Sequence, residues 1–110
     1  MVLRGLREID EHLDSKVSQY YKDQPLAQDW ARVAKALEEA GEAIAALIGY
    51  TGQNPRKGFT HGKEDLLDEL ADLALTGIYA IQHFTKDEDT TYRIIEVRMK
   101  KHMDRVGINV

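Results

Sequence analysis

The sequence predicts an all-α protein, a bundle of four helices that homodimerisation completes. Apolar residues between positions 3 and 21 recur every three or four residues, which is the spacing of one helix face. The stretch from 26 to 50 is rich in alanine and leucine and lacks the alternation of a strand. Both prolines, Pro25 and Pro55, lie in polar, turn-prone segments and interrupt no helix. These observations favour helices packed on helices in a single domain spanning residues 1–110.

Four helices are expected, with one long loop between the second and the third. Their expected ranges, in order, are 3–21, 26–50, 63–84 and about 90–107. The loop, residues 49–62, is marked by four glycines and a proline. Thr90 or Thr91 is expected to cap the fourth helix, because threonine oxygens accept the free N–H groups of a first turn. Gly107 is a suitable stop, since glycine is favoured just beyond a helix end.

Composition and charge exclude several classes of protein. The formal net charge of −4 argues against a nucleic-acid polymer as partner, which would require a basic excess. No cysteine is present, so disulfides and cysteine metal sites are excluded. No apolar run reaches the ~20 residues of a membrane helix, and the charged N-terminal segment lacks the apolar region of a signal peptide. We therefore expect a cytoplasmic protein with no membrane partner.

The second helix carries a pair of glutamates among small apolar residues. Its bulky apolar face comprises Trp30, Val33, Leu37, Ile44 and Ile48. Glu39 and Glu42 lie on the opposite side with Lys35 and several alanines, where a solvated face would carry more Lys, Gln and Arg. Both faces of this helix are therefore expected to be packed against other residues, and a single chain of 110 residues has few residues with which to cover both. A second copy would supply them, so we expect a homodimer or a dimer of dimers.

The third helix carries a narrow polar stripe on a leucine-rich surface. Its members are Asp65, Glu69, Asp72, Thr76, Tyr79 and His83. Glu69 and Asp72 repeat the i, i+3 spacing of Glu39 and Glu42, which points both carboxylates of a pair the same way. Two buried, facing pairs repel each other and are costly to desolvate, and a divalent cation removes both problems. Oxygen ligands suit a hard cation, so Mg²⁺ is expected, with Mn²⁺ as a substitute.

Other interpretations of these acids are open. Acidic residues three apart are common on exposed helices, where they bind nothing, although two pairs on consecutive apolar helices are harder to dismiss. A di-iron carboxylate bundle would need a Glu-x-x-His pair from each of two helices, and neither pair here contains that histidine. A non-catalytic helical interaction module that binds metal or a nucleotide is the remaining alternative.

Residues 38–42 (EEAGE) and 69–72 (ELAD) form an EExxE…ExxD pattern. This pattern resembles that of MazG-like nucleotide pyrophosphohydrolases, the all-α NTP pyrophosphatases. The preceding residues 35–37 and the segment 51–58 (TGQNPRKG), with Thr60 and His61, resemble one short, single-domain branch of that family. The resemblance covers roughly residues 30–84, and the paired motif is far more specific than either half alone.

The resemblance implies a reaction and a set of residues that carry it. The reaction is hydrolysis of a nucleoside or deoxynucleoside triphosphate to the monophosphate and pyrophosphate by a metal-activated water. The implied ligands of Mg²⁺ are Glu39, Glu42, Glu69 and Asp72. Catalytic roles fall to Glu38 and Glu39, with Glu38 either a further ligand or the base for the attacking water. The family also implies a helical dimer with its sites near the subunit contact.

Basic residues near the acids are candidates for binding the phosphates of the substrate. Arg56, Lys57 and Lys35 are the nearest cations, and cations of this kind pair with phosphate oxygens. The glycines of the loop would let its backbone approach a ligand closely. His61 lies in the same loop and either reaches phosphate or is simply exposed.

Two aromatic residues are candidates for contacts with the base. Tyr79 continues the acidic stripe and is suited to the base or the sugar. Trp30 could stack on a base, although a single tryptophan on an apolar face is more often a core residue. His83, near the end of its helix, is expected to interact with the last carbonyls. The basic run of the fourth helix is typical of a solvated face, or it completes the site of a partner subunit.

Overall fold

The computed structural model describes residues 3–19 and 24–109 and consists of helices joined by short segments. The helices are α1 (Leu6–Ser18), α2 (Pro25–Thr51), α3 (Lys63–Thr85) and α4 (Glu88–Arg105). The described residues contain no strand, so the prediction of an all-α fold is confirmed. None of these helices is long and apolar enough to cross a membrane.

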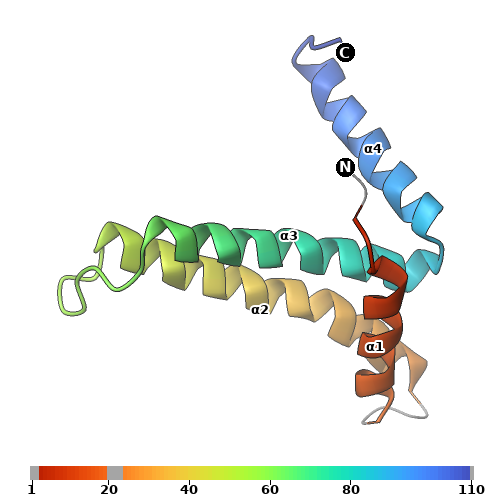
Figure 1. Cartoon of the computed structure of the whole chain (residues 1–110), viewed down its shortest axis with the longest axis horizontal. Coiled ribbons are helices and arrows are strands. Elements are labelled where there is room, and N and C mark those ends of the chain that lie inside the picture. Colours follow the sequence, from red (N-terminus) through yellow and green to blue (C-terminus); the bar gives the residue numbers. More distant parts are fainter. Residues whose placement is uncertain (1–2, 20–23, 110) are drawn as a thin grey trace.

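The second and third helices form a long antiparallel hairpin that organises the molecule (Figure 1). The predicted loop closes one end of this hairpin. At the other end α1 crosses the hairpin, and α4 leaves from the same end and projects away from it. The two long helices of the hairpin therefore form the main body of the chain, and α1 packs across them at one end.

Most helix boundaries follow local signals in the sequence. Pro25 opens α2, where its missing N–H has no intrahelical partner to lose, and Gly52 ends α2 in the left-handed conformation at φ 65°. The prediction that Thr90 or Thr91 caps the last helix is wrong. Asp87 lies upstream and caps it first, since its carboxylate accepts the backbone N–H of Thr90.

The first and last helices differ slightly from expectation at their ends. α1 begins at Leu6 rather than at position 3, because Gly5 adopts the left-handed conformation at φ 84° and the chain before it is not helical. The predicted continuation of α1 through Tyr20 and Tyr21 lies outside the described residues. Gly107 follows α4 at φ 74°, as its role as a stop requires.

Small residues let α2 and the loop pack closely. The buried positions of α2 are Arg32, Ala43, Ala46 and Gly49. A Cβ at Gly49 would lie 2.1 Å from Nδ1 of His61 and 2.3 Å from Oγ1 of Thr60, so only glycine fits. The carbonyl of Gly49 accepts the backbone N–H groups of both loop residues, which folds the loop back onto the end of α2.

The bulky apolar face of α2 is exposed in this single chain. Trp30 and Leu37 are 77% and 78% exposed, and Val33 and Ile44 are also exposed. The expectation that Trp30 is a core residue is therefore wrong within one chain. The radius of gyration is 17.0 Å, against about 13 Å for a compact domain of this size. The chain by itself is open, and its core is small.

Candidate metal centre

Three carboxylates from the two helices of the hairpin meet near its middle. Glu39 lies on α2, and Glu69 and Asp72 lie one turn apart on α3. Each of these side chains offers an oxygen within 4.8 Å of the other two. Residues far apart in the sequence become neighbours here because α2 and α3 run antiparallel. We call these three residues the hairpin carboxylates.

Two of the hairpin carboxylates carry a buried oxygen without a partner. In the described part of the chain, Oε2 of Glu39 and Oε2 of Glu69 are buried and form no hydrogen bond. Burial raises the pKa of both carboxyls, and the nearby charge of Glu42 raises it further. Such a buried acceptor is costly, and carboxylates that share a site repel one another. This all-oxygen set fits a hard divalent cation.

Lys35, Glu38 and Glu42 surround the hairpin carboxylates at the surface. Nζ of Lys35 lies 3.2 Å from Glu38 and 3.8 Å from Glu39, and hydrogen bonding to Glu38 raises the pKa of Lys35. Glu38 is exposed and lies outside the group of three. Glu42 is exposed too, yet its charge acts on the pKa of Glu39 and of Glu69. Glu42 therefore lies close to the group without being part of it, and its role as a metal ligand stays a prediction.

A cavity of about 330 Å³ opens beside these acids. Successive turns of the hairpin line it with Glu39 and Asp72, then Lys35 and Thr76, then Arg32 and Tyr79. The apolar third wall comes from α1, through Ile9, Leu13 and Val17. Seven residues of helix rise about 10 Å, so the cavity extends roughly that far from the hairpin carboxylates to Arg32.

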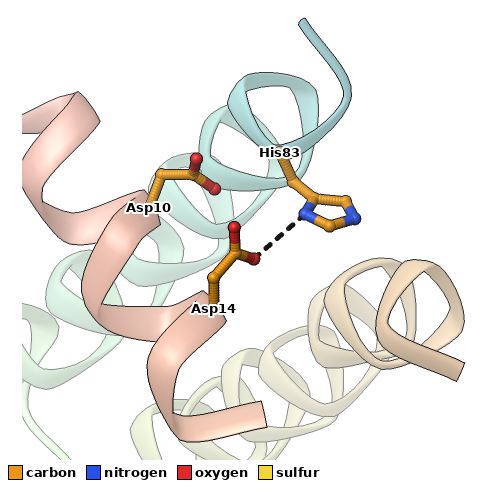
Figure 2. A group of neighbouring side chains, drawn as sticks. All are labelled: Asp10, Asp14 and His83. Atoms are coloured by element: carbon orange, nitrogen blue, oxygen red, sulfur yellow. Dashed lines mark hydrogen bonds and ion pairs between the residues drawn. The ribbon is translucent and has the colours of Figure 1, made fainter. Parts of the chain in front are cut away.

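A second acidic group lies at the α1 end of the hairpin. Figure 2 shows Asp10 and Asp14 of α1 facing His83 of α3, and Asp14 lies 3.2 Å from the His83 ring. The side chains of Arg32 and Lys86 contact both aspartates. These two cations compensate the charges of the group without a metal, whereas among the described residues the hairpin carboxylates have Lys35 at their edge, 3.8 Å from Glu39.

The family model of phosphoribosyl-ATP pyrophosphohydrolases matches residues 6–96, which include the hairpin, its carboxylates and α1. The chain belongs to this family. A search of curated proteins and a search of solved structures found no match.

Phosphoribosyl-ATP pyrophosphohydrolases belong to the all-α superfamily of NTP pyrophosphatases that also contains the MazG-like enzymes. The resemblance seen in the sequence is confirmed at the level of that superfamily, whereas the short single-domain branch stays a prediction. As a member of this pyrophosphohydrolase family, the chain is assigned to the hydrolases that act on acid anhydrides.

The loop residues predicted to bind phosphate in this pyrophosphohydrolase lie away from the hairpin carboxylates of the same chain. Arg56, Lys57 and His61 occupy the loop at the far end of the hairpin (Figure 1). The end of α2 lies nine residues beyond Glu42, which is roughly 14 Å of helix. The His61 ring is hydrogen-bonded to Thr60 and lines a small pocket with Lys57. Within one chain these residues do not join the cavity.

The two aromatic candidates line different cavities. Tyr79 lines the cavity beside the hairpin carboxylates. Trp30 lies in a shallow hollow with Val33 and Phe84, on the exposed apolar face. Only Tyr79 is therefore positioned to meet a ligand bound in the cavity of its own chain.

Arg32, Asp10 and Asp14 were not predicted from the sequence as residues of the site. Arg32 is an arginine on the buried, alanine-rich side of α2, two turns before Glu39, and that setting is the signal that could have drawn attention to it. Asp10 and Asp14 are four residues apart beside the apolar stripe of α1. The expectation that His83 only meets the last carbonyls of α3 is wrong, because its ring lies between Asp14 and another aspartate from α2.

Proposed function

We propose that this chain is a Mg²⁺-dependent nucleotide pyrophosphohydrolase that cleaves a nucleoside or deoxynucleoside triphosphate into the monophosphate and pyrophosphate. The main support is the set of hairpin carboxylates, which lie beside a cavity and, among the described residues, have buried oxygens without a hydrogen-bond partner. An acidic site repels polyphosphate unless cations are present. Glu39, Glu42, Glu69 and Asp72 are the proposed ligands, and Mn²⁺ is a possible substitute.

The proposed chemistry divides between the metal and the side chains around it. Bound Mg²⁺ would neutralise phosphate oxygens and lower the pKa of a water. The Lys35 ammonium, half exposed beside Glu38 and Glu39, is suited to the phosphate tail. Glu38 is exposed at the same edge and is proposed to accept the proton of the attacking water, with Glu39 next to it in the catalytic set. Transfer of this kind needs positioning and charge neutralisation more than a protein nucleophile.

The cavity is the proposed place of the nucleoside. With the phosphates at the hairpin carboxylates, the base would point toward Arg32, between the apolar wall of α1 and Tyr79. Apolar walls with a few polar groups at one end are typical of sites for small ligands. Tyr79 is proposed to contact the base or the sugar.

A homodimer, or a dimer of dimers, is proposed as the working assembly. The support is the exposed apolar face of α2, since a monomer rarely exposes a contiguous apolar patch of this kind. A second copy covering this face would bury Trp30 and Leu37. It would also bring a second loop, with its Arg56, Lys57 and His61, as a possible source of phosphate contacts.

Two substrate classes share the chemistry that the site offers. Nucleoside triphosphates carry the triphosphate chain alone, and phosphoribosyl-ATP, named in the family model, carries the same chain with an added phosphoribosyl group. The proposal covers cleavage between the α and β phosphates of that chain, and the two classes are separated by assay.

The test is release of pyrophosphate from a panel of NTPs, dNTPs and phosphoribosyl-ATP, with and without Mg²⁺. Wild-type protein is expected to release pyrophosphate only with metal. Glu42→Gln and Asp72→Asn are expected to lower kcat/KM at least about 100-fold, because bound metal supplies several kcal/mol of charge stabilisation. Asp68→Asn, an exposed acid on α3 outside the group, is the matched control and should keep its activity.

The rival interpretations predict other outcomes in the same preparation. A non-catalytic module that binds metal or a nucleotide would release no pyrophosphate from any substrate, or the same amount in the variants. A di-iron protein would contain iron after aerobic purification and absorb visible light. Among the described residues no histidine joins the hairpin carboxylates, which favours Mg²⁺ over that alternative.

A further inference from the structure

Arg32 connects three helices through one buried guanidinium. The side chain is 5% exposed. Its Nη1 lies 2.9 Å from Asp14 and donates to it, and the same atom lies 2.8 Å from Asp10 in an ion pair outside hydrogen-bond geometry. Its Nη2 donates to the backbone carbonyl of Tyr79 at 2.9 Å. One residue of α2 therefore holds α1 and α3 at once.

Other polar groups complete this contact between the helices. Nζ of Lys86 donates to Asp10 at 2.9 Å and to Asp14 at 2.5 Å. The His83 ring meets Asp14 through Nδ1 at 3.2 Å and a carboxylate of α2 through Nε2 at 2.7 Å. We call this set the polar latch; its members are Asp10, Asp14, Asp29, Arg32, His83 and Lys86. A metal bound by the two aspartates would have to displace Arg32 and Lys86. The polar latch is therefore better explained as a set of contacts that holds α1 against α2 and α3.

α1 has few other attachments along its length. Its N-terminal end is held by α4, where Glu88 accepts the backbone N–H of Arg7, and Leu6 is buried. Farther along, its apolar side faces the cavity, and Ile9 is still 36% exposed there. A helix face over a cavity gains less from hydrophobic burial than one over a filled core. The polar latch therefore decides how the middle of α1 sits over the hairpin.

We propose that Arg32 is a positioning residue for nucleotide binding, which holds α1 in place as the third wall of the cavity through Asp10 and Asp14. This inference rests on the proposed function, because it takes the cavity beside the hairpin carboxylates as the nucleotide site. Arg32 is buried and its guanidinium is engaged with protein groups, so it acts through α1 rather than by touching substrate. Loosening the latch should widen the site without altering the carboxylates that carry the chemistry.

Asp14→Asn tests the latch while keeping the shape of the side chain. Glu11→Gln, on the exposed side of the same helix, is the matched control for charge. The expected result is roughly tenfold faster amide hydrogen exchange in α1, with α2 and α3 unchanged. The KM for the nucleotide should rise roughly tenfold and kcat stay within about twofold, since ground-state binding is what changes. Lys86→Met should behave like Asp14→Asn, and Lys86→Arg should behave like wild type.

Each outcome decides a separate part of the inference. Equal rates of amide hydrogen exchange in α1 of Asp14→Asn and Glu11→Gln would overturn the proposal that the polar latch holds α1. This outcome does not depend on whether the enzyme is active. Faster exchange with an unchanged KM, or a fall confined to kcat, would overturn its role in binding. If wild-type protein releases no pyrophosphate, the proposed function fails instead. The Kd of the protein for ATP in the presence of Mg²⁺, measured by calorimetric titration, then takes the place of KM. An ATP affinity that Asp14→Asn leaves unchanged, or no binding at all, would then overturn the positioning role.

Discussion

At the scale of single residues, the molecule contains two partly buried acidic groups whose negative charges have different surroundings. Asp14 is surrounded by cations, and although burial by itself raises its pKa, Lys86 and Arg32 lower the pKa below its ordinary value. In the described part of the chain an oxygen of Glu69 has no hydrogen-bond partner, and burial and neighbouring carboxylates raise the pKa of Glu69. The first group is neutralised by cations of the protein, whereas the second has the half-exposed Lys35 at its edge and is suited to a metal cation.

Glu69→Gln is therefore expected to raise the Tm of metal-free protein by several degrees at pH 7. The pKa of Glu69 is raised in the folded state, so its ionisation costs stability as pH rises above about 4.5, and the amide avoids that cost. The gain should shrink as the pH falls below that value, where the wild-type carboxyl is protonated in both states. Thermal melts in EDTA over a range of pH measure the difference in Tm between Glu69→Gln and wild type. Glu96→Gln, which removes a charge from exposed α4, is the control, and a lower Tm for Glu69→Gln would contradict the argument.

At the scale of elements, the junction between α3 and α4 sets the direction in which α4 leaves the hairpin. Lys86 ends α3 in the left-handed conformation at φ 55°, and Asp87 then caps α4. Buried Thr91 donates a hydrogen bond to the side chain of Gln82, which ties the first turn of α4 to α3. The two caps follow each other directly, so the chain turns sharply with no linker.

Asp87→Ala is expected to cost about 1 kcal/mol of unfolding free energy, the usual cost of losing such a cap. Its hydrogen bonds with Thr90 lower the pKa of Asp87 below 3.8. The contribution of the cap is therefore present above that pH and is lost as the pH falls through the lowered pKa. Denaturant melts at pH 7 and pH 2 measure both effects. Asp89→Ala removes the same charge from the first turn without the cap, and an equal loss there would contradict the cap's role.

At the scale of the whole molecule, the chain is too open to bury its own apolar surface. Small residues of α2 face α3, while bulky residues such as Leu37 face outward. Burial of large apolar side chains is the main source of stability in a domain, so the exposed face is best explained as a contact with a second copy.

Leu37→Glu is expected to dissociate the proposed homodimer. Placing a charge at the centre of an apolar contact should raise the dimer Kd at least about 30-fold, the effect of losing a 2 kcal/mol hot spot. Sedimentation equilibrium over a concentration series measures the Kd. Leu37→Met keeps the apolar contact and should dimerise like wild type. A wild-type chain that stays monomeric at all concentrations would contradict the assembly.

Much of the site could be predicted because its residues lie close together on each helix. Glu39 and Glu42, and Glu69 and Asp72, are spaced at i, i+3, so their shared direction follows from helix geometry alone. Arg32 could not be placed, because its partners lie on α1 and α3 and a single helix does not specify them. Trp30 was expected in the core because an apolar stripe predicts burial without saying against which surface.

The sequence by itself determined the helices, the two carboxylate pairs and the resemblance to pyrophosphohydrolases, since periodicity, turn residues and short motifs are local properties. Only the tertiary structure decided that Glu39 meets Glu69 and Asp72 beside a cavity, and that α1 is fastened over it by charges. It also decided that the apolar face of α2 is left open. These features depend on which faces of separate helices meet, and that choice arises from packing and charge pairing across the whole chain.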